Sequence, residues 1–266
     1  MDKKVSVKKI LKKIPFLVYI KRIIHFKYEY AQDTKNYIKN YMYSSESQNK
    51  LEYEMLLISH SIEKAFLNNK PRPFGIEKTK RLMHIIKTIK DKKYPQSNTY
   101  FIGLQCLNKY KEFYEKQKWQ NKSEYQEVLS FLKNYKIDKN KINIGSYIIT
   151  KKNIKEKSNI NYKEFLESRH SIRDFEDKKL NGKDIESAIE TAILSPSACN
   201  RQMCKIYYIS NKKMQEKVKS YGQGFGNFNL SNANFFIITF DVAAFSSIGE
   251  RNQGWLNAGL FSMNFV

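Results

Sequence analysis

Apolar residues at helical spacing recur through the first 135 residues of this chain, and this pattern constrains the fold most. One helical face is formed by Leu51, Met55, Ile58, Ile62 and Phe66. The same reasoning predicts further helices at 77–91, 98–118 and 122–135. Residues 28–43 are rich in Tyr without a clear period. The sequence therefore predicts a mostly helical first half.

Charge divides the chain into two unlike parts. Residues 1–160 contain 35 Lys and Arg against 15 Asp and Glu, a net charge of +20, whereas residues 161–266 have a net charge of +2. A basic half can meet nucleic acid, anionic lipid or acidic polymer. Clustered Arg, RNP-type aromatic segments and zinc-ligand spacing are missing from the sequence, so a solvated Lys-rich surface is favoured and nucleic acid is the least favoured partner. The polar stretch 151–160 predicts a linker between a basic helical extension, 1–150, and a second domain, 161–266.

The amino-terminal segment 3–27 combines positive charge with an apolar face. It carries nine Lys or Arg, and the one nearby acid is Asp2. Its apolar positions at helical spacing are Ile10, Leu11, Ile14, Leu17 and Val18, with Pro15 straining the middle of the helix. Such a helix can make peripheral contact with an anionic membrane or pack its apolar face against its own protein, and packing is slightly favoured.

Two features predict a cytoplasmic protein. The apolar run Ile14–Ile20 is much shorter than the roughly 20 residues that span a bilayer, and no small-residue cleavage site follows it. The three cysteines are odd in number and form no C-x-x-C motif, which indicates a reducing compartment.

The second half alternates helices and strands. Tyr162–Ser168 predicts a short helix, and Asn181 is a good N-cap for the next one. The core-facing stripe of that helix is formed by Ile185, Ala188, Ile189, Ala192 and Ile193, and Pro196 stops it. The remaining predicted elements are a strand at Lys205–Ser210, a helix at Lys212–Tyr221, a strand at Phe235–Phe240 buried on both faces, and a helix at Asn252–Val266 with Gly254, Ala258 and Gly259 for close packing. This last pattern has no ending signal, so we expect the natural protein to continue beyond Val266.

Arg169, Ser171 and Arg173 are two residues apart, which places them on one side of an extended backbone. Two guanidinium groups and a hydroxyl form a site for a dianionic phosphate. The motif alone is weak, because a solvated surface segment is the default interpretation.

Asn200 and Gln202 are also two residues apart, in the loop that follows Ser195–Pro196. Their side-chain amides both donate and accept hydrogen bonds, which suits the mixed polar edge of a flavin ring. A polar loop at a helix C-terminus is the alternative interpretation. Cys199 in the same loop is interpreted as inert packing rather than as a nucleophile.

The order of these segments (S-R-H-S-I-R-x-F, a helix, S-P-S-x-x-N-x-Q, then a strand) resembles the nitroreductase family of FMN enzymes, over roughly residues 161–266. The first half resembles the helical extension of a subgroup found among polysaccharide-biosynthesis proteins, through His60–Lys64 and Pro73–Gly75. The resemblance implies an α+β fold, a nitroreductase-like α/β sandwich in which helices flank a mixed central sheet, preceded by a mostly helical region.

The resemblance also implies roles for particular residues. Arg169, Ser171 and Arg173 would hold the FMN phosphate and ribityl end, with His170 near the ring. The isoalloxazine would be lined, across a homodimer interface, by Pro196, Ser197, Asn200 and Gln202. Gly224 and Phe225 would belong to a loop over the substrate. Met203 departs from the family, which often has Pro there.

The function that the resemblance implies is hydride transfer from NAD(P)H through FMN to a small-molecule acceptor, with no residue assigned as a general base. The alternative is a non-catalytic protein that keeps the fold and docks through its basic half. His and Cys residues show no metal-ligand spacing, so no metal site is predicted.

Overall fold

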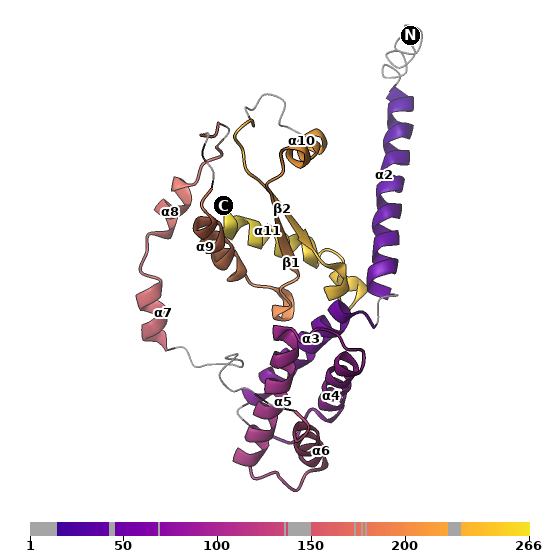
Figure 1. Cartoon of the computed structure of the whole chain (residues 1–266), viewed down its shortest axis with the longest axis vertical. Helices are drawn as coiled ribbons and strands as arrows, with labels where there is room; N and C mark the ends of the chain where they lie inside the picture. Colours follow the sequence, from indigo (N-terminus) through magenta and orange to yellow (C-terminus); the bar gives the residue numbers. More distant parts are fainter. Residues whose placement is uncertain are drawn as a thin grey trace.

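A computed structural model of the chain describes residues 15–42, 46–68, 70–135, 137, 150–172, 174–176, 178, 180–222 and 230–266. Over these residues the protein is mostly helical, with one small antiparallel sheet of two strands (Figure 1). No helix in these ranges combines the length and the apolar character that a membrane span needs.

The helical body consists of α3 (Gln48–Phe66), α4 (Ile76–Asp91), α5 (Asn98–Lys116) and α6 (Ser123–Leu132). The helices predicted over these four stretches are confirmed. Serine hydroxyls cap two of them, because Ser47 accepts a hydrogen bond from the Lys50 amide and Ser97 accepts one from the Tyr100 amide.

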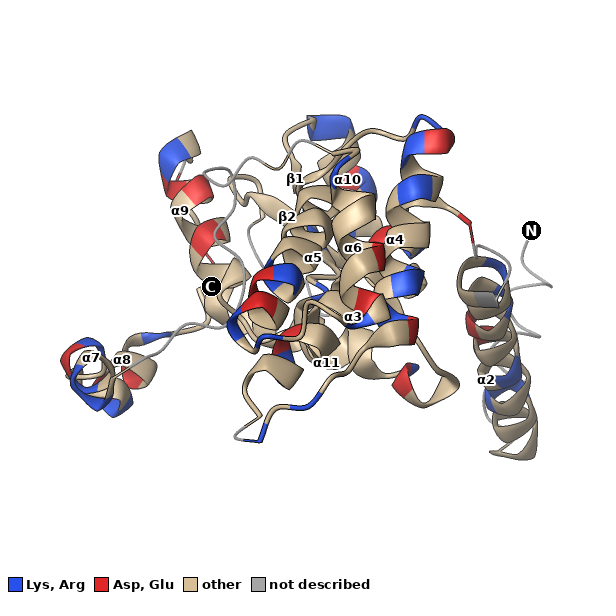
Figure 2. Cartoon of the chain, turned by 90° about the horizontal axis from the view of Figure 1, so that it is seen from below, with Lys and Arg blue, Asp and Glu red and all other residues tan. Residues whose placement is uncertain are grey.

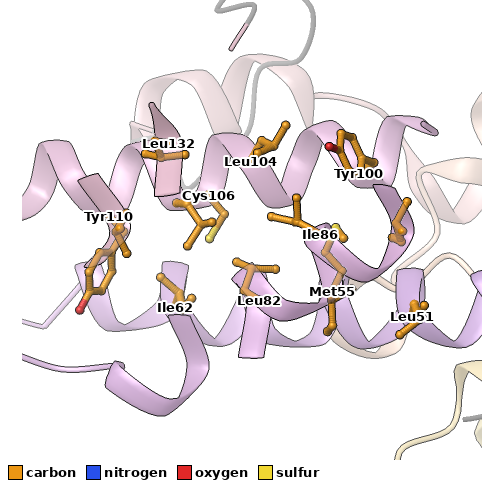
Figure 3. Close-up of a cluster of buried hydrophobic side chains, with 14 of the residues drawn as sticks. Leu51, Met55, Ile62, Leu82, Ile86, Tyr100, Leu104, Cys106, Tyr110 and Leu132 are labelled. Atoms are coloured by element: carbon orange, nitrogen blue, oxygen red, sulfur yellow. The ribbon is translucent and has the colours of Figure 1, made fainter. Parts of the chain in front are cut away.

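Side chains from all four helices form one closed core (Figure 3). Met55, Ile86 and Leu107 are completely inaccessible to solvent. At Gly103 a Cβ atom would lie 2.4 Å from the Met55 sulfur, so the absence of a side chain lets α5 approach α3 closely. The predicted apolar faces of these helices therefore do meet one another.

The second half contains α7 (Lys151–Lys157), α8 (Tyr162–Ser168), α9 (Gly182–Ile193), η2 (Ala198–Asn200), β1 (Cys204–Ile209), α10 (Lys212–Tyr221), β2 (Phe235–Phe240), η3 (Val242–Ala244), η4 (Ile248–Glu250) and α11 (Gln253–Phe265). β1 pairs antiparallel with β2, with Cys204 opposite Phe240 and Ile209 opposite Phe235. Asn181 caps α9 as predicted, since its side chain accepts from the Lys183 amide. The predicted mixed central sheet and sandwich stay predictions.

Several local predictions for this half are wrong. None of the six residues of β2 is fully buried, because the described sheet has two strands and leaves one face open. Ile193 on the α9 stripe is 49% exposed. Residues 151–157 form the helix α7 without buried residues, and their role as a linker stays a prediction. A Cβ at Gly254 would lie 2.2 Å from the Phe240 ring, which confirms close packing there, whereas Gly259 has no neighbour within 4 Å.

The amino-terminal helix also differs from expectation. α2 (Pro15–Tyr37) covers part of the Tyr-rich stretch, and the π-helix η1 (Ile38–Met42) follows it. Pro15 is the first described residue of this helix, so its predicted effect on the helix stays a prediction. No residue of α2 is buried, so the favoured packing of this helix against its own protein is wrong for the described part. Residues 1–14 lie outside the described ranges. The predicted division of the chain at 151–160 stays a prediction.

Candidate functional site

The turn that follows α9 has an unusual backbone. Cys199, Asn200 and Gln202 have φ values of 52°, 52° and 49°, in the left-handed region that residues other than glycine seldom adopt. Such conformations persist only where surrounding contacts impose them, and they concentrate at functional sites. Three of them within four residues make Ser197–Gln202 the leading candidate for a binding element.

Ser197 holds this turn in place. Its hydroxyl accepts hydrogen bonds from the Gln202 backbone amide at 3.0 Å and from the Asn257 side chain of α11 at 3.2 Å. The Gln202 side chain in turn donates to the Asn200 side-chain oxygen at 2.8 Å. The two predicted amides therefore lie next to each other, exposed, on one side of the turn.

Arg201, between the two amides, points the other way and is 1% exposed. Its two terminal nitrogens each donate to a Glu250 carboxylate oxygen at 2.9 Å, and its Nε donates to the Ala198 carbonyl at 2.9 Å. Burial alone would raise the pKa of Glu250, but the bonds from Arg201 and from the Ser246 amide hold that pKa below its ordinary value. This paired charge fixes the inner side of the turn.

Sequence reasoning assigned no role to Arg201. No local signal in the sequence shows which way Arg201 points, because the turn has neither strand nor α-helical periodicity. The partner Glu250 is 49 positions away, and only the fold brings the two together.

The end of α9 is fastened to α11. The Ser195 hydroxyl accepts from the Asn264 side chain at 2.8 Å and donates to the Leu260 carbonyl at 3.3 Å. Pro196 follows and is exposed, and α9 ends before it, as predicted.

The predicted phosphate segment lies at the opposite end of α9 from the turn (Figure 1). Arg169, His170 and Ser171 are exposed just after α8. The twelve residues of α9 separate them from η2, a length of roughly 18 Å at the α-helical rise per residue. One copy of the chain therefore does not bring the two predicted groups together. Arg173 lies outside the described residues, as do Gly224 and Phe225.

The helical body forms a wall beside the turn. A cavity of about 340 Å³ separates them, and Asn200, Gln202 and Lys205 line one side of it. Opposite are Asn49, Glu52 and Tyr53 of α3 and Thr99 and Ile102 of α5. These residues were not predicted from the sequence. The helical pattern of the first half does not show which face of α3 or α5 packs against the second half of the chain.

Asp241 joins the two walls of this cavity. Its carboxylate accepts from the Asn49 side chain at 3.0 Å, from the Tyr53 hydroxyl at 3.5 Å and from Lys205 at 3.4 Å. Burial, with the nearby Asp241 charge, raises the pKa of Tyr53 and keeps its hydroxyl a donor. Lys50 of α3 also donates to the Phe245 carbonyl at 2.6 Å, and burial lowers the pKa of that lysine.

Other candidate chemistry is limited. Among the described residues no group of three or more His, Cys, Asp or Glu side chains is placed to hold a metal ion. Cys199 is a half-buried free thiol within the strained turn. The turn is therefore equipped for binding through amides rather than for acid–base chemistry.

Comparison with known proteins finds a family match in the second half of the chain. Residues 166–264 match the Nitroreductase family, a stretch that includes both the segment around Ser171 and the strained turn. A Staphylococcus epidermidis protein, whose name assigns it provisionally to the NAD(P)H nitroreductases, is 32% identical over 73 residues. These residues are 27% of this chain and 33% of that protein, so the chain spans about a third of its relative. No solved structure was found to match.

Proposed function

We propose, from the family match over residues 166–264, that this chain acts in an FMN-dependent oxidoreductase of the nitroreductase type. The single observation that supports the proposal most strongly is the turn Ser197–Gln202, which presents two amides outwards on a backbone imposed by Ser197 and Arg201. NAD(P)H is the proposed donor, and the relative's name supports that choice. A link to polysaccharide biosynthesis rests on the sequence resemblance.

The donor chemistry of these residues fits FMN. Amides that both donate and accept suit the carbonyls and N–H of the isoalloxazine edge, and a guanidinium with a neighbouring hydroxyl suits the phosphate. Asn200 and Gln202 supply the first set, and Arg169 and Ser171 belong to the second. When bound, FMN supplies the two-electron carrier between nicotinamide and acceptor.

We further propose that the flavin site lies between two copies of the chain. The two predicted sets of binding residues lie at opposite ends of α9 in one copy. The phosphate-binding residues Arg169 and Ser171 of one copy would therefore lie next to the turn Ser197–Gln202 of the other. Large apolar side chains near the turn are available for such an interface, because Leu194 is 82%, Trp255 69% and Leu256 62% exposed. Apolar exposure of this kind marks association surfaces.

In this arrangement the chain's own residues bind and orient the ring. With FMN bound, the Asn200 and Gln202 amides would hold the polar edge of the ring, and the Arg201–Glu250 pair would keep the turn in its present shape. The acceptor is proposed to occupy the cavity that these amides share with α3 and α5. Its lining by Asn49, Glu52 and Thr99 favours a small polar acceptor.

An FMN titration of the purified chain tests the proposal. We expect flavin fluorescence to change on binding, and replacement of both amides (Asn200→Ala with Gln202→Ala) to weaken FMN affinity roughly tenfold or more, because two hydrogen bonds are lost. Asn121→Ala, an exposed amide between α5 and α6, is the matched control and should bind FMN normally. A colourless protein with no response to FMN would contradict the proposal and favour the non-catalytic alternative.

A second experiment locates the acceptor. Thr99→Trp should fill the cavity and slow oxidation of the reduced flavin by 4-nitrobenzamide, while FMN affinity stays unchanged. Glu112→Trp, on an exposed position of α5, is the control. Equal rates for both variants would place the acceptor elsewhere.

A further inference from the structure

Helix α2 extends away from the rest of the molecule (Figures 1 and 2). It has 23 residues, none of them buried. At its carboxyl end Tyr37 stacks on Phe245, with ring centroids 5.4 Å apart, which anchors the helix to the family-matched region. Burial raises the pKa of Tyr37 to about 12, as expected for a hydroxyl at a covered contact. The rest of α2 therefore presents its side chains to whatever surrounds the protein.

The large apolar side chains of α2 lie mainly on one side of the helix. At 100° per residue, one half of the circumference carries large apolar and aromatic groups. They are Phe16, Tyr19, Ile20, Ile23, Ile24, Phe26 and Tyr30, each at least 36% exposed. The other half carries Lys21, Arg22 and His25 together with Leu17 and Tyr28, which are 37% and 58% exposed. His25 lies 3.7 Å from Glu29 on this half. An apolar surface this long is costly in water, so it indicates a binding surface.

The positive charge of the amino-terminal region indicates what covers the apolar face of α2. Helix α2 carries four cations, Lys21, Arg22, Lys27 and Lys35, against two acids, Glu29 and Asp33. Six further lysines precede it in the sequence, and no acid occurs between Asp2 and Glu29. A bilayer surface rich in anionic lipid attracts such a segment, and Tyr side chains are favoured at the headgroup level. Lys27 lies on the apolar side, where its long stem lets the ammonium reach headgroups. A second α2 is the poorer partner, since two copies of this segment repel one another and its broad aromatic face lacks a narrow coiled-coil seam.

We propose that α2 lies in the plane of an anionic membrane surface, with its Phe16–Tyr30 apolar face in the headgroup region. The family-matched domain is thereby held at the membrane through the Tyr37–Phe245 contact. This proposal rests on the exposed face and the charge of α2, and it stands whether or not the chain binds flavin.

Vesicle co-sedimentation of the full chain tests it. We expect strong binding to vesicles of phosphatidylcholine with phosphatidylglycerol, little binding to phosphatidylcholine alone, and weaker binding as salt rises. Ile20→Glu with Ile23→Glu should reduce binding at least tenfold. His25→Glu with Gln32→Glu places two acids on the opposite face of the same helix and should keep binding within about threefold, which separates burial of the apolar face from net charge.

All four substituted positions are unburied, so circular dichroism should show unchanged folding for both variants. Three results would overturn the proposal. They are the absence of binding to anionic vesicles, equal loss in both double variants, and a wild-type oligomer that ignores vesicles but dissociates on Ile20→Glu with Ile23→Glu. The last result would identify α2 as a contact between copies.

Discussion

The helical body, Gln48–Leu132, and the family-matched stretch, 166–264, bury their apolar residues in opposite ways. The body encloses sixteen buried residues in one cluster drawn from its own four helices (Figure 3). The described part of the matched stretch has a buried cluster of Met203, Ala244 and Phe245. Tyr37, Tyr41 and Tyr53, all from outside that stretch, cover it.

This difference shows that one region forms its own core and that the other depends on neighbouring elements. The body can stabilise itself, because its apolar faces are directed inwards. The matched stretch relies on α2, η1 and α3 for its cover and leaves Leu194 and Trp255 exposed beside the strained turn. In the function proposed above, the body would be a rigid support and the matched stretch would be the part that contacts the cofactor and the second copy.

Ile86→Ala should give the largest effect. Ile86 is completely buried in the body, so its truncation should lower the free energy of unfolding by about 3 kcal/mol through lost burial and a cavity. Met214→Ala, at an exposed residue of the matched stretch, should change it by less than about 0.5 kcal/mol. Urea denaturation measures both. Equal losses in the two variants would contradict the conclusion that the helical body depends on its own buried core.

Arg201→Met should come next, with a loss of about 2 to 3 kcal/mol, because it leaves the Glu250 carboxylate without its partner. The exposed neighbour Arg251→Met is the control and should be nearly neutral. FMN affinity should fall for the first variant, since the turn loses its inner anchor. Retained affinity in a destabilised Arg201→Met protein would mean that the pair stabilises the fold without shaping the turn.

Alanine substitutions at two glycines of α11 test which side of this helix is packed. Gly254→Ala should destabilise the protein by about 1 to 2 kcal/mol, because its Cβ would meet the Phe240 ring. Gly259→Ala should stabilise it by about 0.5 to 1 kcal/mol, since the new methyl meets nothing and Ala is the better helix former. Thermal unfolding compares them. Destabilisation by both would show that α11 is packed on two sides.

The smallest effect is a pH dependence from Glu250. Its pKa is lowered in the folded state, so its contribution is complete above the unfolded value of about 4.3 and disappears as pH falls through the folded pKa. The wild-type unfolding free energy should therefore fall more steeply below about pH 4.3 than that of Glu250→Gln. If the unfolding free energies of the two proteins changed in parallel with pH, the ionised Glu250 carboxylate would gain no stabilisation from Arg201.

Local sequence pattern predicted much of the architecture, for a physical reason. Amphipathic spacing and capping residues such as Asn181 act within one turn or one helix, so the helices around Leu51 and Ile185 were predictable. The burial of β2 was not, because it depends on how many strands join the sheet. The inward direction of Arg201 and the wall that α3 builds against Asn200 depend on contacts between residues tens of positions apart.

The central claim is a flavin site shared by two copies, and mixing two defective variants tests it most directly. Arg169→Glu alone and Asn200→Ala with Gln202→Ala alone should each bind FMN poorly, since every site in either homodimer lacks one group. Unfolding and refolding them together at equal amounts should restore about a quarter of the wild-type sites, because half of the dimers are mixed and each has one intact site. If the site lay within a single chain, no mixture would recover any binding, and that result would contradict the account.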